Sequence, residues 1–244
     1  MMKTEKEVQK FYNVFAKKQA ITGTNLRHYT IINHLMNYGL KKNHNVLEIG
    51  CGIGTLTKLI YRFLNKGELV ATDISDESIQ IAKTRITTGS KDNMKFFVTD
   101  MKDFNYPKKF DFIVLPDVLE HIPIEQHPDL FSTLSRHMHE KSIILIHIPH
   151  PTALDFIREH EPEKLQIIDQ SINADVIINN SYANNLFLID YISYSLYNNK
   201  ADYVLATFKK GGIKYKSNSP LSKLTIIYKK TIARIKFLIR KLFI

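Results

Sequence analysis

Three glycines alternate along the chain at Gly50, Gly52 and Gly54. A short apolar run precedes them, and one acid, Glu48, interrupts that run. Apolar residues at spacings of three and four follow, which predicts a buried strand, a tight turn and the start of a helix. Glycine is needed where the backbone turns sharply or where a ligand approaches the main chain without meeting a Cβ atom. The stretch therefore indicates a turn that binds a ligand; an ordinary glycine-rich strand-to-helix turn is the alternative.

The spacing of these glycines distinguishes between kinds of nucleotide site. A dinucleotide fingerprint that starts at Gly50 places its third small residue at Thr55, whereas here the glycine comes one residue earlier, at Gly54. A phosphate-binding loop ends in Gly-Lys-Ser or Gly-Lys-Thr, and this loop does not. The remaining ligand is a nucleoside that carries no phosphate.

A second acid follows the next predicted strand. The run Leu69–Asp73 ends in a carboxylate 23 residues beyond Gly50 (73 − 50), close to the spacing at which a doubly wound fold offers a carboxylate to a ribose. The two oxygens of a carboxylate suit the paired donors of the 2′ and 3′ hydroxyls. We therefore expect Asp73 to bind a ribose. A role in capping the following helix, which Ser75 opens, is the alternative.

Two motifs resemble those of a known enzyme family. The arrangement of Glu48 and the three glycines resembles the first motif of the class I S-adenosylmethionine-dependent methyltransferases. The run Pro116–Pro123, which is Pro-Asp-Val-Leu-Glu-His-Ile-Pro, resembles the corresponding segment of the branch that methylates quinones and other small molecules. The resemblance spans about residues 26–210, and the cofactor half carries more of it than the acceptor half.

The resemblance implies a fold and a cofactor. The fold is an α/β, doubly wound, Rossmann-like sheet of seven mostly parallel strands with an antiparallel edge hairpin, N-terminal helices and a C-terminal amphipathic helix. The cofactor is S-adenosyl-L-methionine. We expect helices covering the site in residues 1–40, the cofactor-binding domain in 41–210 and a basic amphipathic tail in 211–244, with an insertion in 152–186 that caps the acceptor site.

The resemblance also assigns cofactor contacts. In the family, an acid after the third strand accepts a hydrogen bond from the adenine amino group, and the next residue packs on the ring. Asp100 and Met101 occupy these positions, with a simple loop acid as the alternative for Asp100. The expected cofactor-binding residues are Glu48, Gly50, Cys51, Gly52, Gly54, Asp73, Ile74, Asp100, Met101 and Pro116.

Two related classes of methyltransferase fit the chain poorly. Enzymes that methylate amino groups of nucleic acid or glutamine carry Asn/Asp-Pro-Pro-Tyr/Phe after the fourth strand, whereas residues 115–118 are Leu-Pro-Asp-Val. Metal-dependent catechol-type methylases need clustered acids after the fifth strand, where this chain has histidine and proline. His147 lies on a predicted strand while His137 and His139 lie near a helix end, which argues against a zinc site. We expect no bound metal and no nucleic-acid partner.

Histidines after two of the strands are the candidates for catalysis. Methyl transfer from a sulfonium requires mainly orientation and desolvation, because the charge on sulfur already activates the methyl group. A hydroxyl acceptor also needs a base, and histidine has a suitable pKa. His121 and His150 both lie just past the carboxyl end of a predicted strand, where doubly wound folds bind ligands. We expect His121 to be the base or to position the acceptor, with His150 as second candidate; a structural role, such as a loop cap, is the alternative for each.

Two segments are expected to form the acceptor site. In the family, N-terminal helices lie over the cofactor, and here residues 4–18 and 26–38 have helical patterns. Core packing or a solvated helix face is the alternative for their polar and aromatic residues. The insertion in residues 152–186 has few periodic apolar positions, so no spacing ranks its candidates, among which is Gln166. The expected substrate-binding residues are Tyr12, Arg27, His28, His160 and Gln170.

The net charge of +10 is concentrated at the end of the chain. Residues 209–244 hold eleven Lys or Arg and no acid, which leaves 34 − 11 = 23 basic against 24 acidic residues in the rest. Gly211, Gly212 and residues 216–220 indicate a hinge. Beyond it, residues 221–244 predict a helix with apolar residues on one side and seven cations on the other. The cations break the apolar run, which excludes a transmembrane span and predicts a helix lying on an anionic bilayer. The alternative is a helix that packs on the domain or on a second subunit.

These observations predict a cytoplasmic enzyme. The single cysteine, Cys51, forms no internal disulfide, and residues 1–18 lack the apolar core of a signal peptide. We expect a metal-independent methyltransferase that O-methylates a small or membrane-proximal acceptor, such as a sugar of a lipid-linked glycan or a quinone-type lipid precursor, with the tail on the inner face of the membrane. The alternatives are an N-methyltransferase of a soluble metabolite or amino sugar, and a non-catalytic partner subunit at a membrane.

Overall fold

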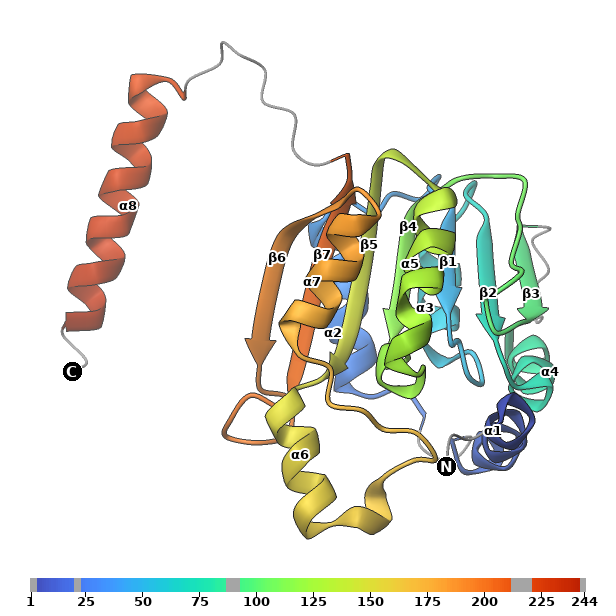
Figure 1. Ribbon diagram of the computed structural model, residues 1–244. Helices are drawn as coiled ribbons and strands as arrows, with labels where there is room; N and C mark the ends of the chain where they lie inside the picture. Colours follow the sequence, from blue (N-terminus) through green and yellow to red (C-terminus); the bar gives the residue numbers. More distant parts are fainter. Residues whose placement is uncertain (1–3, 20–22, 87–92, 212–220, 242–244) are drawn as a thin grey trace. The chain divides into compact units, whose positions relative to one another are not determined.

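The strands of the chain form one mixed sheet. The structure, a computed structural model, describes residues 4–19, 23–86, 93–211 and 221–241. Within them, seven strands lie in the order β3-β2-β1-β4-β5-β7-β6 (Figure 1). Their bounds are β1 Val46–Ile49, β2 Leu69–Asp73, β3 Met94–Val98, β4 Phe110–Pro116, β5 Met138–Pro149, β6 Leu186–Tyr194 and β7 Tyr203–Lys210. The first five run parallel, and β7 pairs antiparallel with both β5 and β6. The predicted doubly wound sheet with an antiparallel edge hairpin is confirmed.

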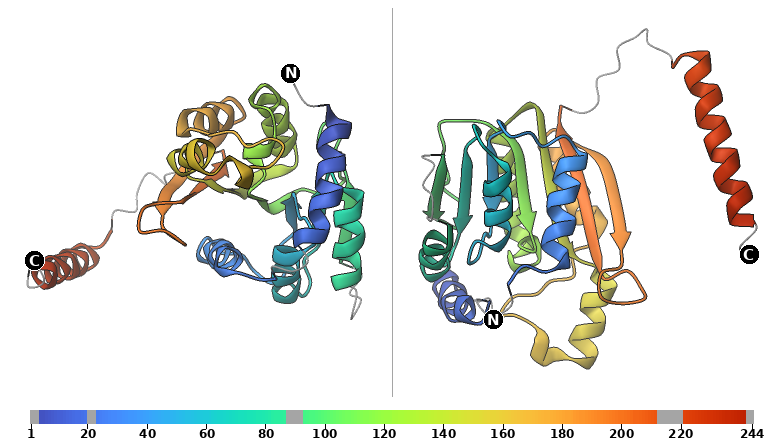
Figure 2. Two further views of the ribbon diagram at one scale, coloured as in Figure 1. Left: turned by 90° about the horizontal axis from the view of Figure 1, so that it is seen from below. Right: turned by 180° about the vertical axis from the view of Figure 1, so that it is seen from behind.

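Helices cover both faces of the sheet (Figure 2). Leu130 and Phe131 of α5 (His127–Arg136) and Ile177 of α7 (Ala174–Ala183) are buried against one face. Ile31 of α2 (Leu26–Asn37) and Ile60 of α3 (Thr55–Phe63) are buried against the other. The strands supply both cores because successive side chains point to opposite faces.

Other helices lie at the ends of the strands. The helix α1 (Glu5–Gln19) packs against α4 (Asp76–Ile86), and with α6 (Pro151–His160) it lies at the edge toward which the parallel strands point (Figure 1). Short helical turns η1 (Leu119–His121), η2 (Ile124–Gln126) and η3 (Pro162–Lys164) connect the remaining elements. The predicted N-terminal helices are therefore present. The segment 152–186, expected as an irregular insertion, also contains α7, whose buried Ile177 makes it part of the layer that covers the sheet.

The chain divides into two compact units, residues 1–212 and 213–244. In the second unit, α8 (Lys223–Lys241) confirms the predicted helix. The predicted hinge at residues 212 and 216–220, and the last three residues of the tail, lie outside the described residues. No helix in the described ranges is long and apolar enough to cross a membrane.

Phe131 provides a test of the core beneath the sheet. Its side chain is 0% exposed, so Phe131→Ala removes a ring from a close-packed interior. We expect this change to lower the free energy of unfolding by about 3–5 kcal/mol, measured by chemical denaturation. Phe156→Ala is the matched control, because the ring of Phe156 is 55% exposed. Its effect should stay within about 1 kcal/mol, and equal losses in the two variants would contradict the assigned core.

Candidate functional site

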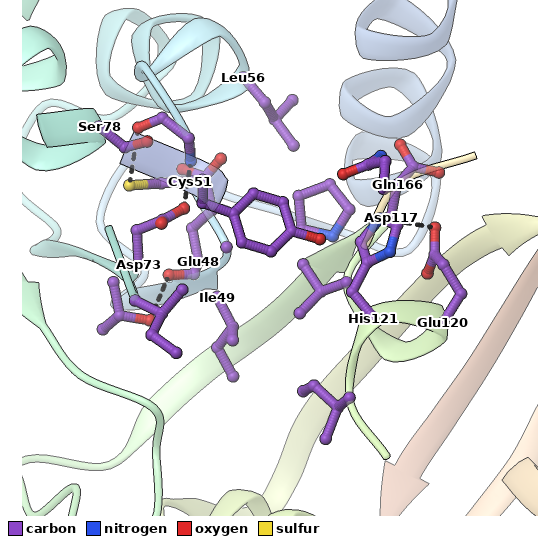
Figure 3. Close-up of a pocket in the computed structure, with 18 of the residues that line it drawn as sticks. Glu48, Ile49, Cys51, Leu56, Asp73, Ser78, Asp117, Glu120, His121 and Gln166 are labelled. Carbon is purple, nitrogen blue, oxygen red and sulfur yellow. Dashed lines mark hydrogen bonds and ion pairs between the residues drawn. The ribbon is translucent and has the colours of Figure 1, made fainter. Parts of the chain in front are cut away.

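A cavity of about 470 Å³ opens at the carboxyl ends of β1, β2 and β4 (Figure 3). The strand order reverses direction between β1 and β4, and such a switch point is where doubly wound folds bind ligands. The walls come from α1, α2, the glycine turn, the ends of β2 and β4, and the loop before α7. All expected cofactor-binding residues except Gly54 line it, namely Glu48, Gly50, Cys51, Gly52, Asp73, Ile74, Asp100, Met101 and Pro116.

The glycine turn requires two of its glycines for different reasons. Gly50 has φ +69°, and a Cβ atom there would clash with the side chain of Val118. Gly54 has φ +78°, and a Cβ atom there would lie 2.9 Å from Ile86 and 3.0 Å from Ala82. Gly54 therefore allows α4 to pack closely and does not line the cavity, and its expected contact with the cofactor stays a prediction.

Asp73 joins the end of β2 to the glycine turn. Its Oδ2 atom accepts a hydrogen bond of 2.7 Å from the amide of Gly52, and its Oδ1 atom accepts one of 2.8 Å from the amide of Ser75. Burial raises the pKa of this carboxyl, and the two amide donors oppose the rise. Each carboxylate oxygen has a further lone pair. Asp73 therefore caps the turn and still has acceptor capacity facing the cavity.

Glu48 is a buried acid beside Thr57 that lacks a well-formed hydrogen bond to the described residues. It is 0% exposed within β1, and neither of its side-chain oxygens is hydrogen-bonded to any described residue. Burial raises its pKa to about 8, which the nearby Thr57 only partly offsets, so the group is mostly protonated at neutral pH. An orphaned buried carboxyl beside an open turn is what a ligand with hydrogen-bond donors would satisfy.

Asp117 is the centre of an ion-pair network on the other side of the cavity. Its Oδ2 atom lies 3.1 Å from the guanidinium of Arg27, and its Oδ1 atom lies 2.7 Å from Nδ1 of His147. The other ring nitrogen of His147 lies 2.5 Å from the hydroxyl of Tyr194. Burial alone would raise the pKa of Asp117, but His147 and Arg27 outweigh it and lower the pKa to about 2. The network fastens α2 to β4, β5 and β6.

His121 lies between two carboxyl groups. Its Nδ1 atom is 2.7 Å from the carbonyl oxygen of Ile168 and 3.0 Å from the carboxylate of Asp169, while Nε2 is 3.8 Å from Oε1 of Glu120. Burial would lower the pKa of His121, but Glu120 and Asp169 outweigh it and raise the pKa to about 9. At neutral pH the ring is therefore an imidazolium, which has no lone pair to accept a proton. This protonation state fits a positioning role for His121 better than the role of base.

The N-terminal candidates also line the cavity. The ring of Tyr12 lies 5.9 Å from that of His121, and its buried hydroxyl has no partner among the described residues. Burial raises the pKa of Tyr12, so the hydroxyl keeps its proton. Burial lowers the pKa of His28 to about 4, so this ring is neutral. Arg27 lines the same wall beside Tyr203.

Three residues expected for catalysis or substrate binding do not line the cavity. His150 begins α6 and accepts a hydrogen bond from the amide of Thr152, which is the loop-cap alternative considered for it. His160 is the last residue of α6, where its ring stacks on Phe156 at 4.2 Å. Gln170 donates to the carbonyl oxygen of Ile122 at 2.8 Å and so fastens the loop before α7 to the turn that carries Glu120. Gln170 therefore supports the wall from outside, because Ile122 lines the cavity.

The residues of the site that were not predicted as contacts include Asp117, Glu120, Asp169 and Tyr203. Asp117 and Glu120 fall in the run whose motif was recognised, so their position relative to His121 was the available signal. Asp169 lies in a loop without periodic pattern, and nothing in the sequence indicated it. No group of three or more His, Cys, Asp or Glu side chains in the described residues has a geometry that would hold a metal ion.

Comparisons with known proteins give the same fold. Residues 46–141 match the family model described as a methyltransferase domain. The chain is 34% identical over 76 residues to malonyl-[acyl-carrier protein] O-methyltransferase 1 of Ilyobacter polytropus, covering 31% of this chain and 28% of that protein. It is 29% identical over 130 residues to ribosomal protein L11 methyltransferase of Thermotoga neapolitana, covering 51% and 44%. The chain thus spans less than half the length of either relative.

A solved structure extends the likeness to nearly the whole fold. Magnesium protoporphyrin IX methyltransferase from Synechocystis PCC 6803, crystallised with bound SAH, superposes with a TM-score of 0.67 at 16% identity. The match covers 84% of this chain and 99% of that one. At this identity the likeness establishes the fold alone.

The ion pair of Asp117 should make stability depend on acid pH. Its pKa is about 2 in the folded chain against an ordinary value of 3.8, so its contribution is complete above about pH 4 and is lost as the pH falls toward 2. Asp117→Asn should cost about 2 kcal/mol at pH 7 and about half as much at pH 3, measured by urea unfolding. Asp155→Asn is the control, since the ion pair of Asp155 with Arg158 is exposed and its loss should change stability by no more than about 0.5 kcal/mol. A deficit for Asp117→Asn that is constant from pH 7 to 3 would refute the assignment.

Proposed function

We propose that this chain, whose residues 46–141 match the methyltransferase-domain family model, binds S-adenosylmethionine and methylates a small or membrane-proximal acceptor. One observation carries the proposal: a single cavity gathers the glycine turn, Asp73, Asp100 and Met101. The cofactor supplies a methyl group that its sulfonium charge has already activated. The protein then has to hold, orient and dehydrate the reactants.

The residues present fit that cofactor. Asp73 offers acceptor oxygens for ribose hydroxyls, and Gly50, Cys51 and Gly52 of the turn line the cavity beside it. The carboxyl of Glu48, which has no hydrogen bond to the described residues, would accept a hydrogen bond from a donor on the cofactor and, while protonated, donate one. Asp100 and Met101 line the part where an adenine would lie.

The helix α1 covers the cofactor half of the cavity and would help to exclude water. Gln9 donates to the carbonyl oxygen of Ile74 at 3.0 Å, directly beside Asp73. Asn13 donates to Asp76 at 2.8 Å and accepts from Ser75 at 2.6 Å. These bonds fasten the helix over the end of β2, so that Tyr12 is presented to the cavity.

The acceptor proposal rests on the residues of this chain, because the names of its relatives and neighbours indicate acceptors of different chemical classes. We favour O-methylation of a sugar of a lipid-linked glycan or of a quinone-type lipid precursor, with His121 positioning the acceptor. An N-methyltransferase of a soluble metabolite or amino sugar uses the same cofactor and the same cavity. A non-catalytic partner subunit would keep the fold without cofactor affinity.

Calorimetry with S-adenosylhomocysteine tests cofactor binding. The intact protein should bind it, and Asp73→Asn should weaken binding about tenfold or more, because a charged acceptor of the ribose is lost. Asp103→Asn is the matched control, since Asp103 is exposed and does not line the cavity. Its affinity should match that of the unmodified chain. No binding to the unmodified chain at high micromolar concentration would favour the non-catalytic alternative.

We further propose that α8 brings the domain to an anionic membrane surface in the cytoplasm. Six of its large apolar side chains are exposed within its own unit, namely Leu224, Ile226, Ile227, Tyr228, Ile235 and Leu238. Lysine and arginine account for all the charged residues in the tail, which complements anionic lipid head groups. A helix with one apolar and one cationic face suits the boundary between head groups and acyl chains.

Liposome sedimentation tests the tail. The full chain should sediment with anionic vesicles at low salt and should be released as salt screens the cations. A variant truncated after Lys210 keeps the sheet and lacks α8, so it should remain in the supernatant. Vesicles of neutral lipid serve as the control for the charge requirement. Equal sedimentation of the full and truncated chains would exclude a role for the tail in membrane binding.

A further inference from the structure

Three buried polar atoms around His121 have no hydrogen-bond partner among the described residues. They are the hydroxyl of Tyr12, Oε2 of Glu120 and Oε1 of Gln166. They come from α1, from η1 and from the loop before α7, and all three residues line the cavity described above. Figure 3 shows His121, Glu120 and Gln166 gathered at one end, away from Asp73 and Cys51.

The chemistry of these atoms selects for a particular partner. The amide oxygen of Gln166 accepts hydrogen bonds, both carboxylate oxygens of Glu120 accept once this group is ionised, and the phenol hydroxyl of Tyr12 can accept as well as donate. Leaving buried acceptors unpaired is costly, so a ligand that carries hydrogen-bond donors would bind with the greatest gain. A hydroxyl or an amine satisfies such a set, whereas a carboxylate adds another acceptor.

The charges of this part of the cavity also favour an acceptor that carries hydrogen-bond donors over one that carries a carboxylate. The cations that line it are already paired, Arg27 with Asp117 at 3.1 Å and His121 with Asp169 at 3.0 Å. The remaining histidine of the lining, His28, is neutral because burial lowers its pKa to about 4. A carboxylate acceptor would therefore meet the charges of Asp117 and Asp169, and that of Glu120 once it is ionised, without an uncommitted cation from the described lining residues to offset them.

We infer that the acceptor presents a hydroxyl or an amine to Glu120 and that Oε2 of Glu120 takes its proton. The inference rests on the proposed methyl transfer and narrows its substrate class. As the oxygen or nitrogen of the acceptor bonds to the methyl carbon, the carbon–sulfur bond breaks and its electron pair stays on sulfur. The proton released by the acceptor passes to Glu120 and then to water.

The surroundings of Glu120 suit a proton acceptor near neutral pH. Burial raises its pKa to about 8, while His121 lowers it and Asp117 and Asp169 raise it. Tyr12, which faces the same carboxyl from α1, remains a neutral phenol. Because the base must be ionised to work, kcat/KM should rise with pH until about pH 8. The imidazolium of His121 would then balance the charge of the ionised carboxylate.

The substrate class can be tested by the chemical stability of the product. The full chain is incubated with S-adenosylmethionine tritiated on its methyl group and with fractionated cell extract, and the labelled product is treated with alkali. Methyl ethers and methylamines survive, whereas a methyl ester of a carboxylate acceptor releases volatile labelled methanol. We expect the label to stay non-volatile. Volatile methanol as the main product would overturn the inference and leave the proposed activity standing, whereas no labelled product at all would count against the activity itself.

The role of Glu120 needs a second readout that does not depend on turnover. The protein is labelled with ¹³C at the glutamate carboxyl carbons and titrated by NMR as its complex with S-adenosylhomocysteine. The signal missing from Glu120→Gln identifies the residue, and its midpoint should lie near pH 8. A midpoint in the ordinary range of glutamate would overturn the assignment. Failure of the unmodified chain to bind S-adenosylhomocysteine would instead refute the proposed function.

Matched variants complete the test. Glu120→Gln keeps the shape of the side chain, so it should reduce methyl incorporation about a hundredfold while its affinity for S-adenosylhomocysteine stays within about threefold. Glu125→Gln removes an exposed carboxylate a few residues away and should leave both quantities unchanged. Undiminished incorporation by Glu120→Gln would exclude Glu120 as the proton acceptor.

Discussion

The hydrogen bond from the amide of Gly52 to Asp73 fixes the corner on which the cavity is built. It joins the turn after β1 to the end of β2, and the same carboxylate also holds the amide of Ser75. The covering helix α1 is fastened to this corner through Gln9 and Asn13. Residues 73–76 therefore hold both the glycine turn, which lines the cavity, and α1, which covers it, so a displacement of Asp73 would disturb both.

The buried acids of the cavity differ because their partners differ. Asp117 has two basic partners and remains a carboxylate, with a pKa of about 2. Glu48 lacks a hydrogen-bond partner among the described residues, while Glu120 shares His121 with Asp169, and burial raises the pKa of each to about 8. One cavity thus contains a permanently charged acid beside acids that can exchange protons near neutral pH. Active sites commonly separate the pKa values of their acids in this way.

The sequence was informative where the chemistry is local. Short stretches of sequence specify the glycine turn, the acid after β2 and the amphipathic patterns of α1, α2 and α8. Each of these features was predicted. Spacing could not decide between His121 and His150, because both follow a strand and the difference lies in where each side chain points. Thr152 offers His150 a backbone amide, so that histidine caps α6. Asp169 lies 48 residues beyond His121 in the sequence (169 − 121), so no local pattern could indicate that the two side chains form an ion pair.

The position of β7 has a consequence for how the chain folds. It is the last strand of the sheet to be synthesised, yet it lies between β5 and β6 and pairs with both. Until residue 210 is available, each of these neighbours has an unpaired edge that can join a strand from another molecule. Completion of the sheet therefore waits for a long-range pairing at the end of the domain, and a nascent or shortened chain that lacks this strand would be prone to aggregate.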